Sequence, residues 1–149
     1  MFVAMAAAFA ILWVYSRITI VESWSLPYTI YWLDVHPDRN TIGKGTFVRF
    51  KLHYYLYHEK NNDAIKRVAC IPGEKLAVDK EKNYYCDEKW LCKAKDYTLK
   101  GEKLNNFVFN GVIPENMFFV VADHKDSLDS RYIGFVTREQ ILQIAHPII

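Results

Sequence analysis

The first 15 residues of this 149-residue chain lack any charged side chain, and all 19 Lys/Arg and 17 Asp/Glu residues follow them. The chain also has only three cysteines and no low-complexity tract. These features exclude a polytopic membrane protein, a disulfide-dense miniprotein and a disordered chain. The net charge is only +2 with both signs mixed, which argues against nucleic acid as a partner. The sequence therefore predicts an apolar N-terminal segment followed by one soluble domain.

The apolar segment lacks the marks of a cleaved signal peptide. No basic residue directly follows Met1, and the run ends in Trp13-Val14-Tyr15 where a small-residue cleavage site would stand. A helix continued through Val21 would span about 31 Å, close to the thickness of a hydrocarbon core. We predict that residues 1–21 form a transmembrane anchor. A removed or truncated segment and a buried core helix are the alternatives.

Short runs rich in Val, Ile, Phe and Tyr occupy much of the remaining chain and predict β-strands. Only the segment 138–144, which follows the capping-type Thr137, favours a helix. The spacing predicts a mainly β domain of coiled, partly barrel-like antiparallel sheets. The predicted strands cover residues 28–33, 46–57, 66–71, 75–78, 107–109, 117–122 and 133–136.

The segment 79–103 is densely charged with alternating signs and predicts a small inserted, solvent-exposed hairpin. Cys86 and Cys92 lie within it, and in an oxidising compartment we predict a disulfide between them. A zinc site would need two more ligands, and no histidine pair has a suitable spacing, so we predict neither a metal nor a cofactor. Cys70, in a predicted strand, is expected to be a small buried hydrophobic residue.

Serine occurs only five times, and four of the five fall in two short segments, residues 22–27 and 126–131. A serine needs a base before it can attack a carbonyl, and either a histidine or a desolvated lysine can serve. Because no Gly-x-Ser-x-Gly elbow is present, a lysine is the better candidate. Lys66 would be desolvated if it pointed inward from its predicted strand, and burial would then lower its pKa. A surface lysine at a strand end, and a Ser/His hydrolase using His124, remain alternatives.

Three segments in order resemble the type I signal peptidase superfamily, whose members are membrane-anchored Ser/Lys endopeptidases. The first is Ser25-Leu-Pro27, directly after the apolar segment. The second, residues 65–74, looks like the family's Lys-Arg-x-x-x-x-Pro-Gly-Asp/Glu segment. The third, residues 123–136, looks like its Ser-x-Asp-Ser-Arg-x-x-Gly-x-Val box. The resemblance implies a signal-peptidase-like catalytic domain of coiled antiparallel sheets over residues 22–149, behind one transmembrane helix.

The serine spacing is closer to one branch of that superfamily. Most bacterial signal peptidases place the nucleophile three residues before the proline, and Trp24 occupies that position here. Ser25 stands two residues before Pro27, in a segment that resembles the Ser-x-Pro-x-Gly-Leu-Tyr pattern of the conjugative-transfer TraF peptidases. Thr29 replaces the glycine of that pattern. We therefore favour a TraF-like peptidase over a general signal peptidase.

The resemblance also implies a role for each polar residue of the three segments. Ser25 matches the nucleophile, and Lys66 matches the general base. The Ser23 hydroxyl and the Ser25 backbone N–H would form the oxyanion hole. The remaining matches are Ser127, which would hold the lysine amine, and Asp129 and Arg131, which would form a buried ion pair that braces the site.

The implied function is cleavage of a membrane-bound precursor, a propilin or a preprotein, after small residues through an acyl-enzyme. The implied location is the bacterial inner membrane, with the catalytic domain on the periplasmic side and the lipid bilayer and conjugation or secretion machinery as partners. In the TraF branch, the substrate's own amino terminus can capture the acyl group and give a cyclic product. A non-catalytic assembly component that binds through residues 54–57 and the charged hairpin is the alternative from another class.

Overall fold

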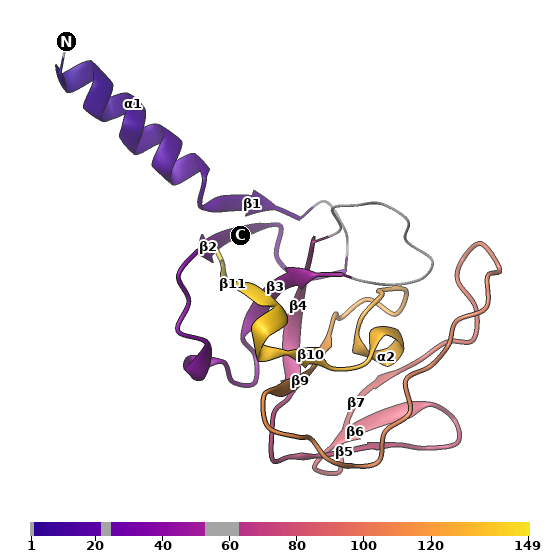
Figure 1. Cartoon of the computed structure of the whole chain (residues 1–149). Helices are drawn as coiled ribbons and strands as arrows, with labels where there is room; N and C mark the ends of the chain where they lie inside the picture. The colour runs from indigo at the N-terminus through magenta and orange to yellow at the C-terminus, as the bar shows by residue number, and fades with distance from the viewer. Residues whose placement is uncertain (1, 22–24, 53–62) are drawn as a thin grey trace.

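Two antiparallel β-sheets form the body of the chain in a computed structural model that describes residues 2–21, 25–52 and 63–149 (Figure 1). The larger sheet has seven strands in the order β1-β2-β11-β3-β4-β9-β10, and the smaller has four in the order β7-β6-β5-β8. The predicted mainly β, antiparallel architecture is confirmed. The larger sheet contains β1 (Ile18–Ile20), β2 (Ile30–Asp34), β3 (Phe47–Lys51), β4 (Asp63–Cys70), β9 (Met117–Val121), β10 (Val136–Thr137) and β11 (Ile141–Pro147). The smaller contains β5 (Lys75–Val78), β6 (Asn83–Cys86), β7 (Lys89–Lys93) and β8 (Gly111–Val112).

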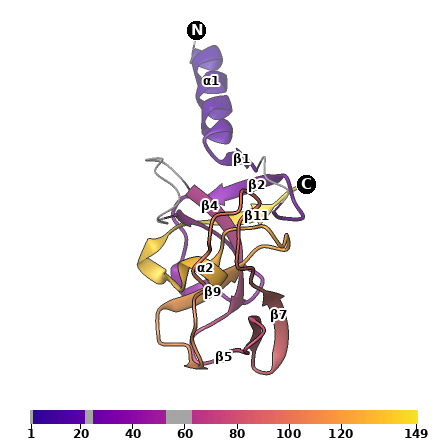
Figure 2. The same ribbon diagram turned by 90° about the vertical axis from the view of Figure 1, so that its right-hand side faces the viewer.

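The N-terminal helix α1 (Phe2–Tyr15) projects away from the sheets in both views (Figures 1 and 2). It ends where the Ser16 hydroxyl donates to the Trp13 carbonyl at 2.7 Å, and the β-branched run Ile18–Ile20 then pairs with β2 as strand β1. The helix that was predicted to continue through Val21 therefore ends at Tyr15. Within the described ranges, no helix is both long enough and apolar enough to cross a membrane.

Several predicted strands agree closely with the observed ones, most closely β5 at residues 75–78. The predicted strand 46–57 begins as β3, and its far end, with the tyrosines at 54–57, lies outside the described residues. Residues 107–109 do not form the predicted strand. Of the predicted strand 133–136, only residue 136 lies in a strand. Residue 133 is the last residue of the short helix α2 (Ser130–Ile133), which the Asp129 side chain caps and Gly134, at φ 79°, ends.

The predicted helix at 138–144 is wrong beyond its first turn. Thr137 and Gln140 do form a reciprocal capping box, but it starts only a 3-10 turn over Arg138–Gln140. The chain then becomes β11, which lies between β2 and β3 and buries Ile141 and Ile144 in the core. Pairing on both sides of the strand outweighs the local helix signal.

The charged segment 79–103 forms a hairpin as predicted, but only one side of it is exposed. Its strands β6 and β7 bury Tyr84, Cys86 and Cys92 against the core beneath β4 and β9. The sequence did not predict this buried face, because strand alternation intersperses its residues with charged residues of the opposite, exposed face. The hairpin is therefore part of the smaller sheet, which packs on the larger one.

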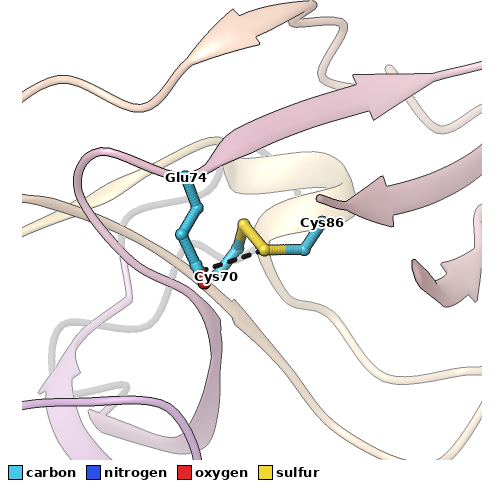
Figure 3. A group of neighbouring side chains, drawn as sticks. All are labelled: Cys70, Glu74 and Cys86. Carbon is cyan, nitrogen blue, oxygen red and sulfur yellow. Dashed lines mark hydrogen bonds between the residues drawn. A yellow bond between two sulfur atoms is a disulfide. The ribbon is translucent and has the colours of Figure 1, made fainter. Parts of the chain in front are cut away.

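The predicted disulfide between Cys86 and Cys92 is wrong. Cys92 pairs in register with Tyr84, while Cys86 stands opposite Lys89, so the two cysteines are not neighbours across the hairpin. Cys86 instead bonds to Cys70, 16 residues earlier at the end of β4, and a Glu74 carboxylate oxygen lies 3.1 Å from its sulfur (Figure 3). Cys70 is thus buried as expected but not as a simple hydrophobic residue. The disulfide joins the larger sheet to the smaller one, and Cys92 is a buried free thiol.

Candidate active site

Lys66 points into the protein from the middle of β4. Side-chain alternation places Lys66 and Val68 on the same face of this strand, while Arg67 faces the other way and pairs with Asp123 at 2.9 Å. A bulge after Val68 then interrupts the alternation, and Cys70 packs in a different core cluster from Val68. Only 7% of the Lys66 surface remains exposed. The inward orientation predicted from the alternation is confirmed, and the surface-lysine alternative is excluded.

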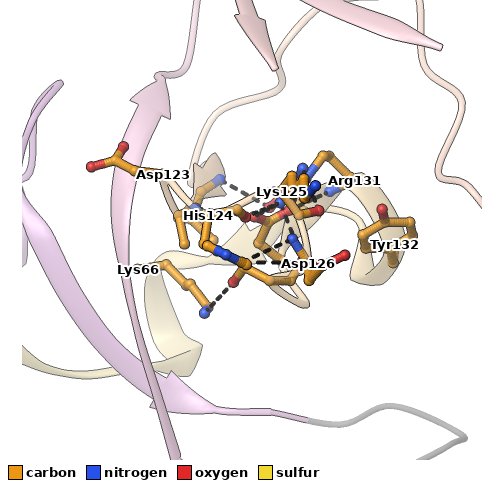
Figure 4. Close-up of polar contacts among 12 residues, drawn as sticks. Lys66, Asp123, His124, Lys125, Asp126, Arg131 and Tyr132 are labelled. Atoms are coloured by element: carbon orange, nitrogen blue, oxygen red, sulfur yellow. Dashed lines mark hydrogen bonds and ion pairs between the residues drawn. The ribbon is translucent and has the colours of Figure 1, made fainter. Parts of the chain in front are cut away.

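The buried amine meets a neutral hydroxyl. Lys66 Nζ donates to Ser127 Oγ at 2.7 Å (Figure 4). The pKa of Lys66 is lowered to about 8, mainly by burial; the Asp129 charge opposes this shift and the Arg131 charge adds to it. A sizeable fraction of this amine is therefore neutral near pH 8, as a general base requires.

Ser127 lies in the loop that follows β9, and the ion pair between Asp129 and Arg131 anchors that loop. Arg131 binds Asp129 through two hydrogen bonds, Nε to Oδ1 at 2.8 Å and Nη2 to Oδ2 at 2.7 Å. Its Nη2 also donates to the Ser127 carbonyl at 3.1 Å, and Asp129 Oδ2 accepts the Ala122 N–H at 3.0 Å. Both side chains are almost fully buried. The predicted buried pair is confirmed as a contact, and it fixes the backbone of the residue whose hydroxyl meets Lys66.

Ser25 is brought to the same loop through its backbone. Its carbonyl accepts N–H groups from Asp123 at 3.0 Å and His124 at 3.3 Å, immediately before the turn that contains Ser127. The next residue, Leu26, is buried with Tyr31 and Leu33, which secures the segment on its other side. Ser25 itself is half-buried. Ser23, the other predicted oxyanion-hole residue, lies outside the described residues.

The histidine of the alternative hydrolase is engaged within its own turn. His124 Nδ1 accepts the Asp126 N–H at 3.2 Å, and 47% of its side chain is exposed. Ser130 and Tyr132 have structural roles, because Ser130 Oγ accepts the Val120 N–H and Tyr132 Oη accepts the Lys95 N–H. The geometry therefore favours Lys66 over His124 as the base.

The sequence did not predict that the charged hairpin and the residues after it contact the Ser127 loop and Arg131. Arg131 Nη1 donates to the Lys93 carbonyl at 3.0 Å, and Lys95 Nζ pairs with Asp126. Tyr84 Oη donates to the Arg131 carbonyl at 3.2 Å. The backbone acceptors in this set carry no sequence signal. The alternating hairpin residues, of which Tyr84 and Cys92 point inward, are the one pattern that indicates an inner face.

A half-buried serine beside a loop that holds a desolvated lysine defines the class of site found in Ser/Lys hydrolases. Comparison with known proteins identifies the family: the family model described as "Signal peptidase, peptidase S26" matches residues 1–149. Signal peptidase IB of Staphylococcus aureus strain Mu50 is 26% identical over 164 residues, covering 94% of this chain and 83% of that protein. Signal peptidase I of Bacillus caldolyticus is 31% identical over 108 residues, covering 66% of this chain and 59% of that protein. A crystal structure of a signal peptidase I from Enterococcus faecalis V583 matches with a TM-score of 0.44 and 22% identity, over 70% of this chain and 96% of that one.

The chain belongs to the S26 signal peptidase family. It is a serine endopeptidase of the signal peptidase I type, as the resemblance of its three segments implied.

Proposed function

We propose that Ser25 and Lys66 form the catalytic dyad of this endopeptidase. The single observation that carries the proposal is the buried Lys66 amine, 2.7 Å from Ser127 Oγ on a loop whose first N–H groups bind the Ser25 carbonyl. Burying a lysine amine without a paired carboxylate costs free energy, so its presence points to a functional use. A base with a pKa near the working pH is such a use.

In the proposed mechanism, neutral Lys66 accepts the proton of the Ser25 hydroxyl while Ser25 Oγ attacks the scissile carbonyl. The resulting oxyanion binds the Ser25 N–H and the Ser23 hydroxyl. Protonated Lys66 then gives its proton to the leaving amine, and the C–N bond breaks to leave an acyl-enzyme. Lys66 next takes a proton from a water molecule, which attacks the ester carbonyl. The bond from the acyl carbon to Ser25 Oγ then breaks, Lys66 returns its proton to Ser25 Oγ, and the acyl product leaves as a carboxylic acid.

Ser127 would act by position, because its hydroxyl accepts a hydrogen bond from Lys66 Nζ and directs the amine. Asp129 and Arg131 would act one step further away by fixing the Ser127 backbone. Neither charged group needs to touch the substrate. Losing the dyad should therefore abolish the reaction with the fold intact, whereas losing the ion pair should first destabilise the fold.

The proposed substrate is a membrane-bound precursor cut after small residues. We propose that residues 1–21 hold the enzyme at the bacterial inner membrane, with the catalytic domain on the periplasmic side and Ser25 close to the bilayer surface. The exposed apolar side chains of α1 and β1 support this placement. Nearness to the membrane would raise the effective concentration of a precursor that emerges from it.

The spacing of Ser25 and Pro27 favours a propilin as this precursor, with conjugation machinery as partner. The named relatives are signal peptidases, so the removal of signal peptides from exported preproteins is the second candidate. Intact-product mass separates two outcomes for a propilin, because a cyclic product is lighter than the linear one by one water.

The test is cleavage of a propilin and of a preprotein in detergent by the wild type, Ser25→Ala and Lys66→Met. We expect both variants to lose at least about 10³-fold in kcat. Ser16→Ala and Lys75→Ala are matched controls at exposed positions and should keep full activity. Full activity of Lys66→Met would refute the dyad, and selective loss in His124→Ala would favour a histidine base. If the wild type cleaves neither precursor, the binding-component alternative gains.

A further inference from the structure

A cavity of about 350 Å³ lies against the loop that carries Ser127. Its lining is mixed: Leu104, Leu128 and Tyr132 contribute apolar surface, and Lys95 and Asp126 contribute charged groups. Tyr97 and Leu99 form an outer rim and are 57% and 83% exposed, unusually high for large apolar side chains. Ser127 belongs both to this lining and to the proposed catalytic apparatus.

The rim of the cavity is a built structure. The chain reverses between Thr98 and Glu102, where Thr98 N–H binds the Glu102 carbonyl at 2.8 Å and Gly101, at φ 81°, completes the turn. Leu104 N–H returns to the Asp96 carbonyl at 2.8 Å. This short hairpin therefore holds Tyr97 and Leu99 at its tip by its own backbone hydrogen bonds.

The rim is also fastened to the Ser127 loop. Lys95 Nζ pairs with Asp126, and Lys95 N–H donates to Tyr132 Oη at 2.9 Å. Asn106 Nδ2 donates to the Lys95 carbonyl at 2.9 Å. In Figure 4, Asp126 and Tyr132 lie on the side toward which Lys66 points. The cavity wall and the catalytic loop are thus linked through Lys95.

The proposed mechanism fixes which part of a substrate comes closest to Ser127. Protonated Lys66 must lie within hydrogen-bonding distance of the leaving amine, and its Nζ is 2.7 Å from Ser127 Oγ. The acyl side of the scissile bond instead faces the oxyanion donors at Ser25. The chain that continues from the leaving amine therefore departs on the Ser127 side, where the cavity lies.

We propose that this cavity is a subsite for the first residues after the scissile bond, and that it accepts one aliphatic or aromatic side chain. The inference rests on the proposed Ser25/Lys66 mechanism, because that mechanism sets the direction of the leaving chain. The occupant is the new amino-terminal segment of the product. Its side chain would cover the apolar surface of Tyr97 and Leu99, and the mixed charges of Lys100 and Glu102 at the rim would contact its backbone.

The first experiment measures kcat/KM for substrates that are identical up to the scissile bond and carry Ala, Leu, Phe or Asp at each of the next three positions. We expect Leu or Phe to exceed Ala by about 10- to 100-fold at one position. The double variant Tyr97→Ala/Leu99→Ala should reduce this preference to about threefold or less while keeping the activity on the Ala substrate. Trp90→Ala, an equally exposed apolar residue that does not line the cavity, should keep the preference.

The second experiment measures binding of a product-derived tetrapeptide, with Leu at the preferred position, to the Ser25→Ala protein by NMR titration. Binding should weaken about tenfold or more in the Tyr97→Ala/Leu99→Ala background and stay unchanged with Trp90→Ala. Cleavage that depends on Ser25 and Lys66 but shows no preference after the scissile bond would overturn the subsite and leave the dyad intact. A preference that survives the double variant, or tetrapeptide binding unaffected by it, would overturn the subsite as well.

Discussion

Two buried cations, one in β4 and one in α2, both contact Ser127, and their surroundings shift their pKa values in opposite directions. Arg131 is 2% exposed and Lys66 is 7% exposed. Burial alone would lower the pKa of Arg131, but the hydrogen bond and charge of Asp129 outweigh it and raise that pKa. Burial is the main cause that lowers the pKa of Lys66 to about 8, and the Asp129 charge offsets it only in part.

The contrast shows how neighbouring sites can serve structure and chemistry separately. A fully paired guanidinium stays charged and donates to four backbone carbonyls, one at residue 93 and three in the loop at residues 124, 125 and 127. An amine without a paired carboxylate can lose its proton near neutral pH. Among the described residues, Lys66 forms no ion pair, and this is what makes it suited to act as a base.

The largest expected effect comes from replacing the unpaired cation by an apolar side chain of similar length. Lys66→Met should lose at least about 10³-fold in kcat, because no base remains for the serine. Its melting temperature should stay the same or rise, since the cost of burying an amine is removed. Circular dichroism melts and precursor cleavage check both results. An inactive variant that also melts far below the wild type would mean that Lys66 is structural.

Replacing the paired cation should have the opposite outcome. Arg131→Met leaves the Asp129 carboxylate buried without its partner, which typically costs about 3–5 kcal/mol of unfolding free energy. Urea unfolding measures this loss. The matched control is Arg67→Met, which breaks the exposed pair with Asp123 and should cost about 1 kcal/mol or less. Equal losses in the two variants would contradict the distinction between the two regions.

The disulfide sets the next effect, because it joins the strand of Lys66 to the hairpin beneath Arg131. Cys86→Ala opens a bridge between residues 16 apart and should cost about 3 kcal/mol. Cys92→Ala, at a buried thiol of the same hairpin, should cost about 1 kcal/mol from lost packing. Urea unfolding gives both values, and peptide mapping without reductant identifies the bond. A peptide joined through Cys92 would contradict the pairing.

The sequence predicted much of the site because its parts follow local rules. Strand alternation places Lys66 inward with Val68, and the short spacing between Asp129 and Arg131 lets the two side chains meet across the start of a helix. What it did not predict depends on pairing between distant segments. Cys86 has Cys92 as its nearest cysteine in the chain, yet the hairpin register sets Cys92 opposite Tyr84 and leaves Cys86 free to reach Cys70.

The two errors at the ends of the chain have a similar cause. Residues 18–20 and 141–144 each continue a segment with a helix signal, and each becomes a strand because an unpaired strand of the larger sheet is available beside it. Pairing with β2 outweighs the local preference at residues 18–20, and pairing mainly with β3 does so at residues 141–144. Pairing between segments that are distant in the chain cannot be predicted from the pattern of a short sequence window.

The pH dependence gives the most direct test of the protonation state of Lys66. In the proposed mechanism only the neutral form of Lys66 is active, so kcat/KM should rise about tenfold per pH unit below pH 8 and level off above it. Lys66 binds fewer protons in the folded state than in the unfolded state between its lowered pKa of about 8 and its ordinary 10.5. The unfolding free energy of the wild type should therefore rise relative to Lys66→Met across this window, by about 3 kcal/mol in all. Rate profiles from pH 6 to 10 and urea unfolding at pH 7.5 and 10.5 test the two signs. A flat rate profile, or a wild type that loses stability relative to Lys66→Met as the pH rises, would show that the buried amine is not the titrating base.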